Sequence, residues 1–124
     1  MSNKFKLTTN TKFVNNTTFY QIQAVKDFFK VKAGELGGWI EKEKNLSQND
    51  NAWVADNVQV SGDARVFGNA KVSGDAQISD DALVYGNAQV SSYARVFGNA
   101  EIAGNAQVAG NSVIYKKKEI MKIN

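Results

Sequence analysis

The chain has 124 residues, a net charge of +3, and no histidine, cysteine or proline. Without cysteine it has no disulfide framework and no thiolate chemistry, and without histidine it lacks the commonest general base and zinc ligand. No apolar run approaches the length of a membrane span and the amino terminus does not resemble a signal peptide, so we expect a cytoplasmic protein with no membrane partner.

Residues 1–39 are predicted to form an amino-terminal β cap. Residues 17–25 alternate between apolar and polar side chains, which favours a strand, and Asn15-Asn16 before them is typical of a two-residue hairpin turn. Lys26-Asp27 should then turn the chain into a short extended run over residues 28–32. The following AGELGGW is expected to be an irregular entry into the next region.

Residues 52–115 repeat with a period of six on the consensus Ala-x-Val-x-Gly-Asn/Asp. The Ala and Val of each hexad lie two apart, so in an extended chain both point to one face, while Gly, Asn and Asp tolerate the positive φ of a tight corner. A helix is excluded because its period is 3.6 and each glycine in it would cost about 1 kcal/mol. The pattern predicts a β-solenoid. Leu46 and Val54 are eight apart, which indicates a small loop near residues 49–51.

An aliphatic residue followed four places later by a small one occurs at Val60 and Ala64, at Val66 and Ala70, and at Val84 and Ala88. This motif resembles the hexapeptide repeat of left-handed β-helices. The resemblance implies an all-β fold: a left-handed parallel β-helix of about four triangular coils over residues 40–115, with residues eighteen apart stacked. The cap would precede it and a basic segment, residues 116–124, would follow.

A narrower resemblance rests on KAGELGGWIEKEKNLS followed by NAWV. It is similar to small hexapeptide-repeat proteins of bacteriophages and prophages, most of which have no assigned function. That resemblance implies a phage-encoded protein in the cytoplasm of an infected or lysogenic bacterium. Such a protein would bind a host protein target as an inhibitor or adaptor, for example against antiviral or CRISPR defence.

Acyltransferases of the hexapeptide family use a histidine as general base, and the carbonic anhydrases of this fold bind zinc through three histidines. With no histidine in the chain, we expect a non-catalytic protein with no cofactor and no metal. Asp63 and Asp81 should stack with Asp80 beside them, either as ordinary corner residues or as ligands of a hard cation. Residues 52–115 are mildly acidic between two basic ends, which does not favour a nucleic-acid partner.

The predicted register places Phe67, Leu83 and Tyr85 on one outward wall, with Phe97 and Tyr115 on the neighbouring one. An outward apolar cluster calls for a partner. That partner is a target protein, another copy in a dimer or trimer, or the chain's own cap. Secondary candidates for the interface are Tyr93, in a corner where Ser92-Tyr93 replaces Gly-Asn, and the basic run Lys116, Lys117 and Lys118.

Two other functions stay open at this point. The chain could be a structural spacer that assembles with itself, or a degenerate relative of the hexapeptide acyltransferases. The second would bind an acyl donor such as a coenzyme A derivative, and the first would bind only its own kind.

Overall fold

The computed structural model describes residues 3–115, which form an all-β chain of fourteen strands and one 3₁₀ turn. Three longer strands come first, β1 (Phe5–Val14), β2 (Thr17–Ala24) and β3 (Leu36–Ile40), and the 3₁₀ turn η1 (Glu43–Asn45) follows them. The remaining strands have two residues each: β4 (Trp53–Val54), β5 (Gln59–Val60), β6 (Arg65–Val66), β7 (Lys71–Val72), β8 (Gln77–Ile78), β9 (Leu83–Val84), β10 (Gln89–Val90), β11 (Arg95–Val96), β12 (Glu101–Ile102), β13 (Gln107–Val108) and β14 (Val113–Ile114).

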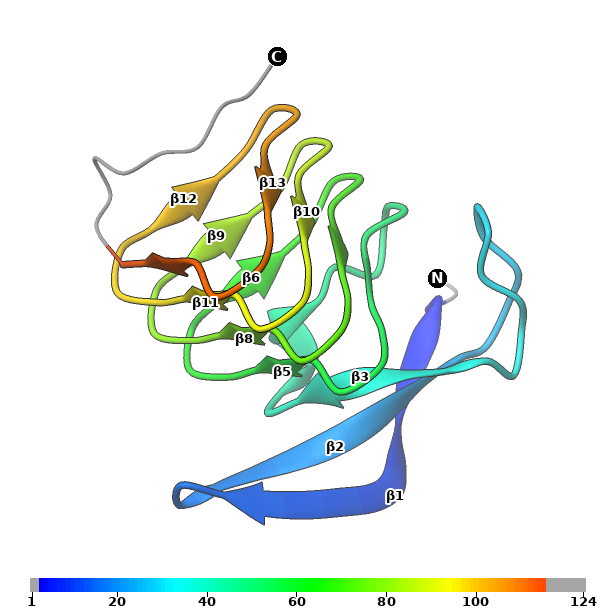
Figure 1. Cartoon of the computed structure of the whole chain (residues 1–124). Helices are drawn as coiled ribbons and strands as arrows, with labels where there is room; N and C mark the ends of the chain where they lie inside the picture. Colours follow the sequence, from blue (N-terminus) through cyan, green and yellow to red (C-terminus); the bar gives the residue numbers. More distant parts are fainter. Residues whose placement is uncertain (1–2, 116–124) are drawn as a thin grey trace.

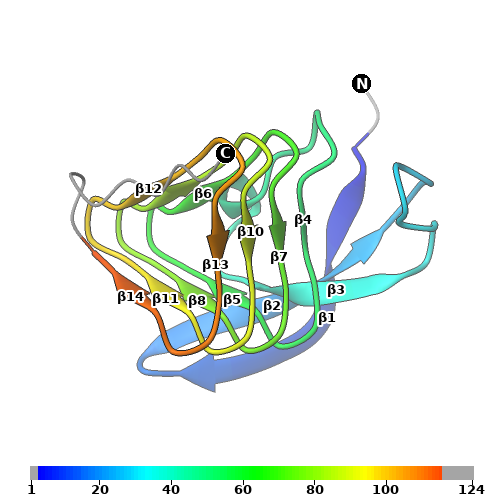
Figure 2. The same ribbon diagram turned by 45° about the horizontal axis from the view of Figure 1, so that its top comes forward.

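The short strands stack into three parallel sheets around one axis, as the hexad period predicts (Figure 1). Val66 pairs with Val84 and Val84 with Ile102, so residues eighteen apart lie one above the other. In Figure 2 the chain runs clockwise from β12 through β13 to β14 as it advances towards the viewer. The molecule is therefore a left-handed parallel β-helix of about four coils, and the predicted fold is confirmed.

The interior of the β-helix is built from the two inward positions of each hexad. Columns of valine and isoleucine and columns of alanine are almost fully buried along its whole described length. Small alanines beside branched side chains let the three sheets approach closely while filling the triangular section. The outward side chains of the three sheets form three walls. We name them the β6 wall (β6, β9 and β12), the β5 wall (β5, β8, β11 and β14) and the β7 wall (β4, β7, β10 and β13).

The corners depend on a positive φ at the fifth place of the hexad. Glycine fills this place in most coils, and Asp56, Asp80 and Ser92 fill it elsewhere at φ 56°, 61° and 59°. At Gly86 an added Cβ would lie 2.9 Å from the backbone nitrogen of Gly104 in the next coil. The corner glycine is therefore needed both for its dihedral angle and for the close stacking of the backbone.

The amino-terminal cap continues one of the three sheets. β1 and β2 form a hairpin whose turn residues Asn15 and Asn16 both have positive φ, which confirms the predicted turn. β2 pairs with β3 in antiparallel fashion, and β3 pairs with β5 in parallel fashion. The predicted irregular entry is confirmed in part, because residues 33–34 form a turn and β3 pairs with β2 through a register shift between Gln21 and Gln23. Gly37 allows it to pack closely, since a Cβ there would lie 2.6 Å from the Trp53 ring.

Two further details concern the segments that lead into the coils. Leu46 bridges to Val66, and the chain bends over residues 48–51 before β4, so the loop predicted near residues 49–51 is present. The extended run predicted over residues 28–32 is wrong. Phe28 and Val31 instead close a tight turn through two backbone hydrogen bonds of 2.8 and 2.9 Å. No helix within residues 3–115 is long and apolar enough to cross a membrane.

Candidate interaction site

The β6 wall carries the three apolar side chains singled out from the sequence. Arg65 pairs with Leu83 in the sheet, and Leu83 with Glu101, so these residues form one outward column. Phe67 and Tyr85 form the second column, where their rings stack with centroids 4.9 Å apart and planes 5° from parallel. Phe67, Leu83 and Tyr85 are each partly exposed. The wall thus presents an apolar patch of Phe67, Leu83 and Tyr85 between Arg65 and Glu101, fixed by the coil stacking.

A second aromatic stack lies on the β5 wall. Phe97 and Tyr115 have ring centroids 5.5 Å apart, and the guanidinium of Arg95 lies 6.0 Å from the Phe97 ring. Tyr115 is 44% exposed, and Val113 beside the stack is 49% exposed. The two stacks repeat the same Phe–Tyr arrangement on neighbouring walls, one or two coils apart along the axis.

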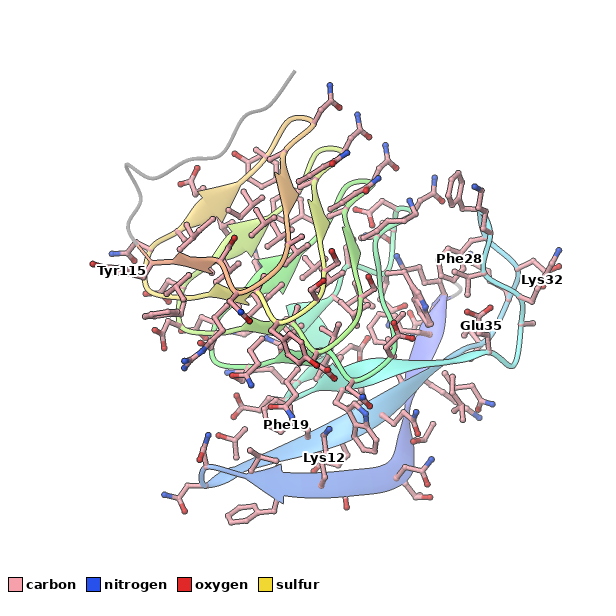
Figure 3. All side chains as sticks on the ribbon, in the orientation of Figure 1. Lys12, Phe19, Phe28, Lys32, Glu35 and Tyr115 are labelled. Carbon is pink, nitrogen blue, oxygen red and sulfur yellow. The ribbon has the colours of Figure 1, made fainter. Side chains whose placement is uncertain are left out.

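The cap hairpin lies beneath the β5 wall and not over the β6 wall. A hollow of about 180 Å³ separates the hairpin from this wall, with Val14, Thr17 and Phe19 on one side and Gln77 and Arg95 on the other. Figure 3 shows Phe19 and Lys12 on the side of the hairpin that faces the coils. Lys12 Nζ lies 4.5 Å from the Trp39 ring centroid, and burial lowers the pKa of this lysine. The apolar cluster of Phe67, Leu83 and Tyr85 is therefore not the surface that the hairpin covers.

A groove of about 510 Å³ opens at the amino-terminal end of the β6 wall, between residues 43–49 and β6. Leu46 and Phe67 supply apolar surface, and Lys44 and Arg65 supply positive charge. Because Phe67 also stacks on Tyr85, the groove and the apolar wall form one continuous surface. We call this surface, made of the groove residues with Leu83 and Tyr85, the groove-and-wall site.

Two polar side chains that sequence reasoning missed hold the groove in shape. Asn45 is fully buried, accepts hydrogen bonds from the backbone of Glu41 and Lys42, and donates to the carbonyls of Gly62 and Ala64. Gln48 accepts from the backbone nitrogens of Lys4 and Phe5 and donates to the carbonyl of Phe5. Most of these bonds join residues far apart in the sequence, so no local sequence pattern predicts them.

The charges around the groove are unevenly paired. Lys44 and Lys42 lie 3.4 and 3.5 Å from Asp63, and hydrogen bonding and attraction from Lys44 foremost hold the pKa of Asp63 below its usual range. Arg65 is exposed and forms no salt bridge within residues 3–115. Glu43 also lines the groove and forms no salt bridge within these residues, so one cation and one anion lie unpaired beside the apolar floor.

Two of the three aspartates considered as cation ligands, Asp63 and Asp80, have other contacts. Asp63 meets the two lysines, and Asp80 accepts a hydrogen bond of 2.9 Å from the backbone nitrogen of Gly98. Asp80 is itself a corner residue with positive φ. In the part of the chain that the structure describes, no three His, Cys, Asp or Glu side chains gather in a way that could hold a metal ion.

The remaining candidates lie apart from the groove-and-wall site. Tyr93 is 64% exposed, and Ser92, not Tyr93, takes the positive φ in that corner. Lys116, Lys117 and Lys118 lie outside the described residues.

Two comparisons with known proteins concern the repeats. The family model described as the YdcK beta solenoid repeat matches residues 58–74 and 76–92. The "Uncharacterized acetyltransferase YdcK" of Escherichia coli (strain K12) is 46% identical over 41 residues, which is 33% of this chain and 13% of that protein. The chain thus matches only a small part of the relative's length. The repeats are similar to a hexapeptide-like β-solenoid.

The matched repeats include Phe67, Leu83 and Tyr85, whereas the cap lies outside them. Neither match concerns a phage protein, so the resemblance to phage and prophage proteins stays a prediction.

Proposed function

We propose that this protein is a non-catalytic β-helix that binds another protein through the groove-and-wall site. The observation that carries the proposal is the stack of Phe67 on Tyr85 at the mouth of a groove of about 510 Å³. Aromatic side chains next to a pocket are the usual anchors of protein interfaces. The rigid coils display them with little loss of conformational freedom on binding.

The absence of histidine and cysteine supports binding over catalysis. A general base poised near neutral pH would have to come from a carboxylate or a lysine, which are ordinarily fully charged at that pH. From the resemblance of KAGELGGWIEKEKNLS and NAWV to phage and prophage proteins, we further propose that the protein is phage-encoded. It would then act on a host protein as an inhibitor or an adaptor. A second copy is an alternative occupant of the same site.

The experiment compares Leu83→Glu with Gln89→Glu. Leu83 lies in the centre of the β6 wall, and Gln89 is an exposed residue on the β7 wall, so both changes add one carboxylate to an outward strand position. Both variants should keep the circular dichroism spectrum and the unfolding midpoint of the parent. Mass in solution, measured by light scattering, and co-purification of a defined host protein should change only for Leu83→Glu.

Two outcomes would count against this site. If Leu83→Glu unfolds the chain, the β6 wall is covered by other parts of the same molecule. If both variants associate like the parent, the interface lies elsewhere.

Acyl transfer is the competing function, and it is supported by the similarity of the repeats to the uncharacterized acetyltransferase YdcK of Escherichia coli. Calorimetric titration with acetyl-coenzyme A separates the two functions. We expect no saturable heat. Stoichiometric binding would favour a degenerate acyltransferase over a protein-binding module.

A further inference from the structure

The turn that joins β2 to β3 carries a phenylalanine in an unusual backbone conformation. Phe29 has φ of 47° and is the first of the two residues between Phe28 and Val31, which are joined by backbone hydrogen bonds in both directions. This place in a two-residue turn is normally filled by glycine or asparagine, because a Cβ makes positive φ unfavourable. A bulky aromatic residue there is a true outlier, and such outliers gather at functional sites.

Burial does not compensate for the strained conformation. The Phe29 side chain is 58% exposed, whereas its neighbour Phe28 packs edge-on against Trp53 with ring centroids 5.4 Å apart. Phe28 thus anchors the turn on the first coil, and Phe29 is displayed at its tip. Figure 3 shows the turn, with Phe28, Lys32 and Glu35 labelled, beside the coils.

Positive charge surrounds the displayed ring. Lys71 Nζ lies 4.1 Å and Lys30 Nζ 5.5 Å from the centroid of the Phe29 ring. Lys26 and Lys32 flank the turn and are exposed. Among residues 3–115, none of these four lysines forms a salt bridge.

The nearby acids are engaged with the backbone. Asp27 accepts a hydrogen bond from the nitrogen of Ala33, and Glu35 accepts one from the nitrogen of Lys32. These bonds shape the turn, and within residues 3–115 neither carboxylate forms a salt bridge with the four lysines. An exposed aromatic ring within a ring of unpaired cations is complementary to an apolar side chain flanked by carboxylates.

We propose that Phe29, with Lys30 and Lys71, forms a second docking site, for an acidic protein segment that carries a large apolar side chain. Lys71 belongs to the β7 wall, so this site and the groove-and-wall site lie on different sheets and can be occupied together. A protein with two such sites links two partners, which is the action of an adaptor.

Two other ligand classes fit the surface less well. The outward column that continues from Lys71 on the β7 wall consists of Gln89 and Gln107, so within residues 3–115 this column offers no basic stripe along which a nucleic acid backbone could run. A membrane requires several apolar side chains to enter the lipid together, whereas the Phe29 ring lies against Lys71 at the side of the β-helix.

The test uses fluorescence anisotropy with a labelled peptide of about twelve residues, in which Trp and Leu are flanked by Asp and Glu. The matched probe replaces every carboxylate by the amide. The full chain should bind the acidic probe at least tenfold more tightly than the amide probe, and the difference should shrink with added salt. Phe29→Gly and Lys71→Gln should each weaken binding at least tenfold.

The thermal stability of Phe29→Gly is a second measurement. If Phe29 had a purely structural role, its replacement would lower the unfolding midpoint. Glycine relieves the positive φ, so the midpoint of thermal unfolding should rise by a few degrees while binding is lost. Phe13→Ser is the control, because Phe13 is 70% exposed on β1, away from the turn, and its loss should change neither. Leu83→Glu should bind the probe like the parent, which keeps this test independent of the groove-and-wall site.

Three results would overturn the proposal. The first is no saturable binding of the acidic peptide. The second is a lower unfolding midpoint for Phe29→Gly, which would give Phe29 a structural role. The third is Phe29-dependent binding to phosphatidylglycerol vesicles in place of the peptide, which would make the turn a membrane contact.

Discussion

Lys4 donates a hydrogen bond of 2.6 Å from Nζ to the carbonyl oxygen of Ala52, which ties the first strand to the first coil of the β-helix. The same ammonium group donates to the carbonyl of Asp50 at 2.8 Å and lies 3.5 Å from the Asp50 carboxylate. Lys4 is only 1% exposed. Burial lowers its pKa from 10.5 to about 8, and the attraction of Asp50 offsets only part of that effect.

The first prediction is that stability rises with pH between about 8 and 10.5. Below pH 8 Lys4 is protonated in both the folded and the unfolded chain. Between the two pKa values the unfolded chain binds more protons, so the free energy of unfolding increases with pH, by up to about 3 kcal/mol. Urea unfolding at pH 7.5 and pH 10 measures the change. Lys4→Met removes this component, so a parent and a variant with the same pH dependence would contradict the lowered pKa.

The second prediction separates two effects of a corner glycine. Gly86→Ala meets the Gly104 backbone at 2.9 Å, whereas Gly110→Ala meets no atom of the described residues 3–115 within 4 Å, and both positions have positive φ. Gly110→Ala should lose about 1 kcal/mol from its dihedral angle alone, and Gly86→Ala about 3 kcal/mol from dihedral and stacking together. Equal losses in chemical denaturation would show that the coils move apart easily.

The third prediction is a stabilising change. Ser92 occupies a corner at φ 59°, where glycine is more favourable, so Ser92→Gly should raise the free energy of unfolding by about 1 kcal/mol. Ser91 precedes it without a positive φ, and Ser91→Gly should lower stability by about 0.5–1 kcal/mol. Opposite signs for adjacent serines in one thermal unfolding series are the expected result.

The fourth prediction concerns the buried amide beneath the groove. Asn45→Ala removes four hydrogen bonds and leaves the carbonyls of Gly62 and Ala64 without these partners, so it should cost about 3 kcal/mol. Asn49→Ala, on the exposed rim of the groove, should stay within about 0.5 kcal/mol of the parent. Similar effects on the denaturation midpoint would mean that Asn45 does not hold the groove in shape.

The sequence predicts the coils well because one period determines both local structure and long-range contact. Once Val66, Val84 and Ile102 share a face, their stacking follows, and the outward positions of Phe67 and Tyr85 follow from it. The two-residue turn at Asn15-Asn16 is predictable for a local reason, since asparagine tolerates positive φ.

The cap and the groove are less predictable because their contacts join distant segments. Nothing near Lys4 in the sequence indicates that its ammonium group meets Asp50 and Ala52, and nothing near Asn45 indicates the carbonyls of Gly62 and Ala64. At Phe29 the local sequence pattern predicts the wrong structure. An apolar run such as Phe28-Phe29 favours a strand, yet the packing of Phe28 on Trp53 and the paired backbone bonds to Val31 make it a turn.

Each coil contains three hexads, so the number of hexads between two residues decides whether their side chains face the same wall. The hexad Ala-Arg-Val-Phe-Gly-Asn occurs identically at residues 64–69 and 94–99, thirty residues apart, and its two copies face different walls. Inserting a whole coil of eighteen residues would lengthen the molecule and leave every downstream side chain on its original wall. Inserting a single hexad would preserve the core pattern equally well but rotate everything after it by one wall. Six residues inserted between residues 69 and 70 would therefore move Tyr85 to a different wall from Phe67. The chain would still fold, but the stacked aromatic pair would be lost.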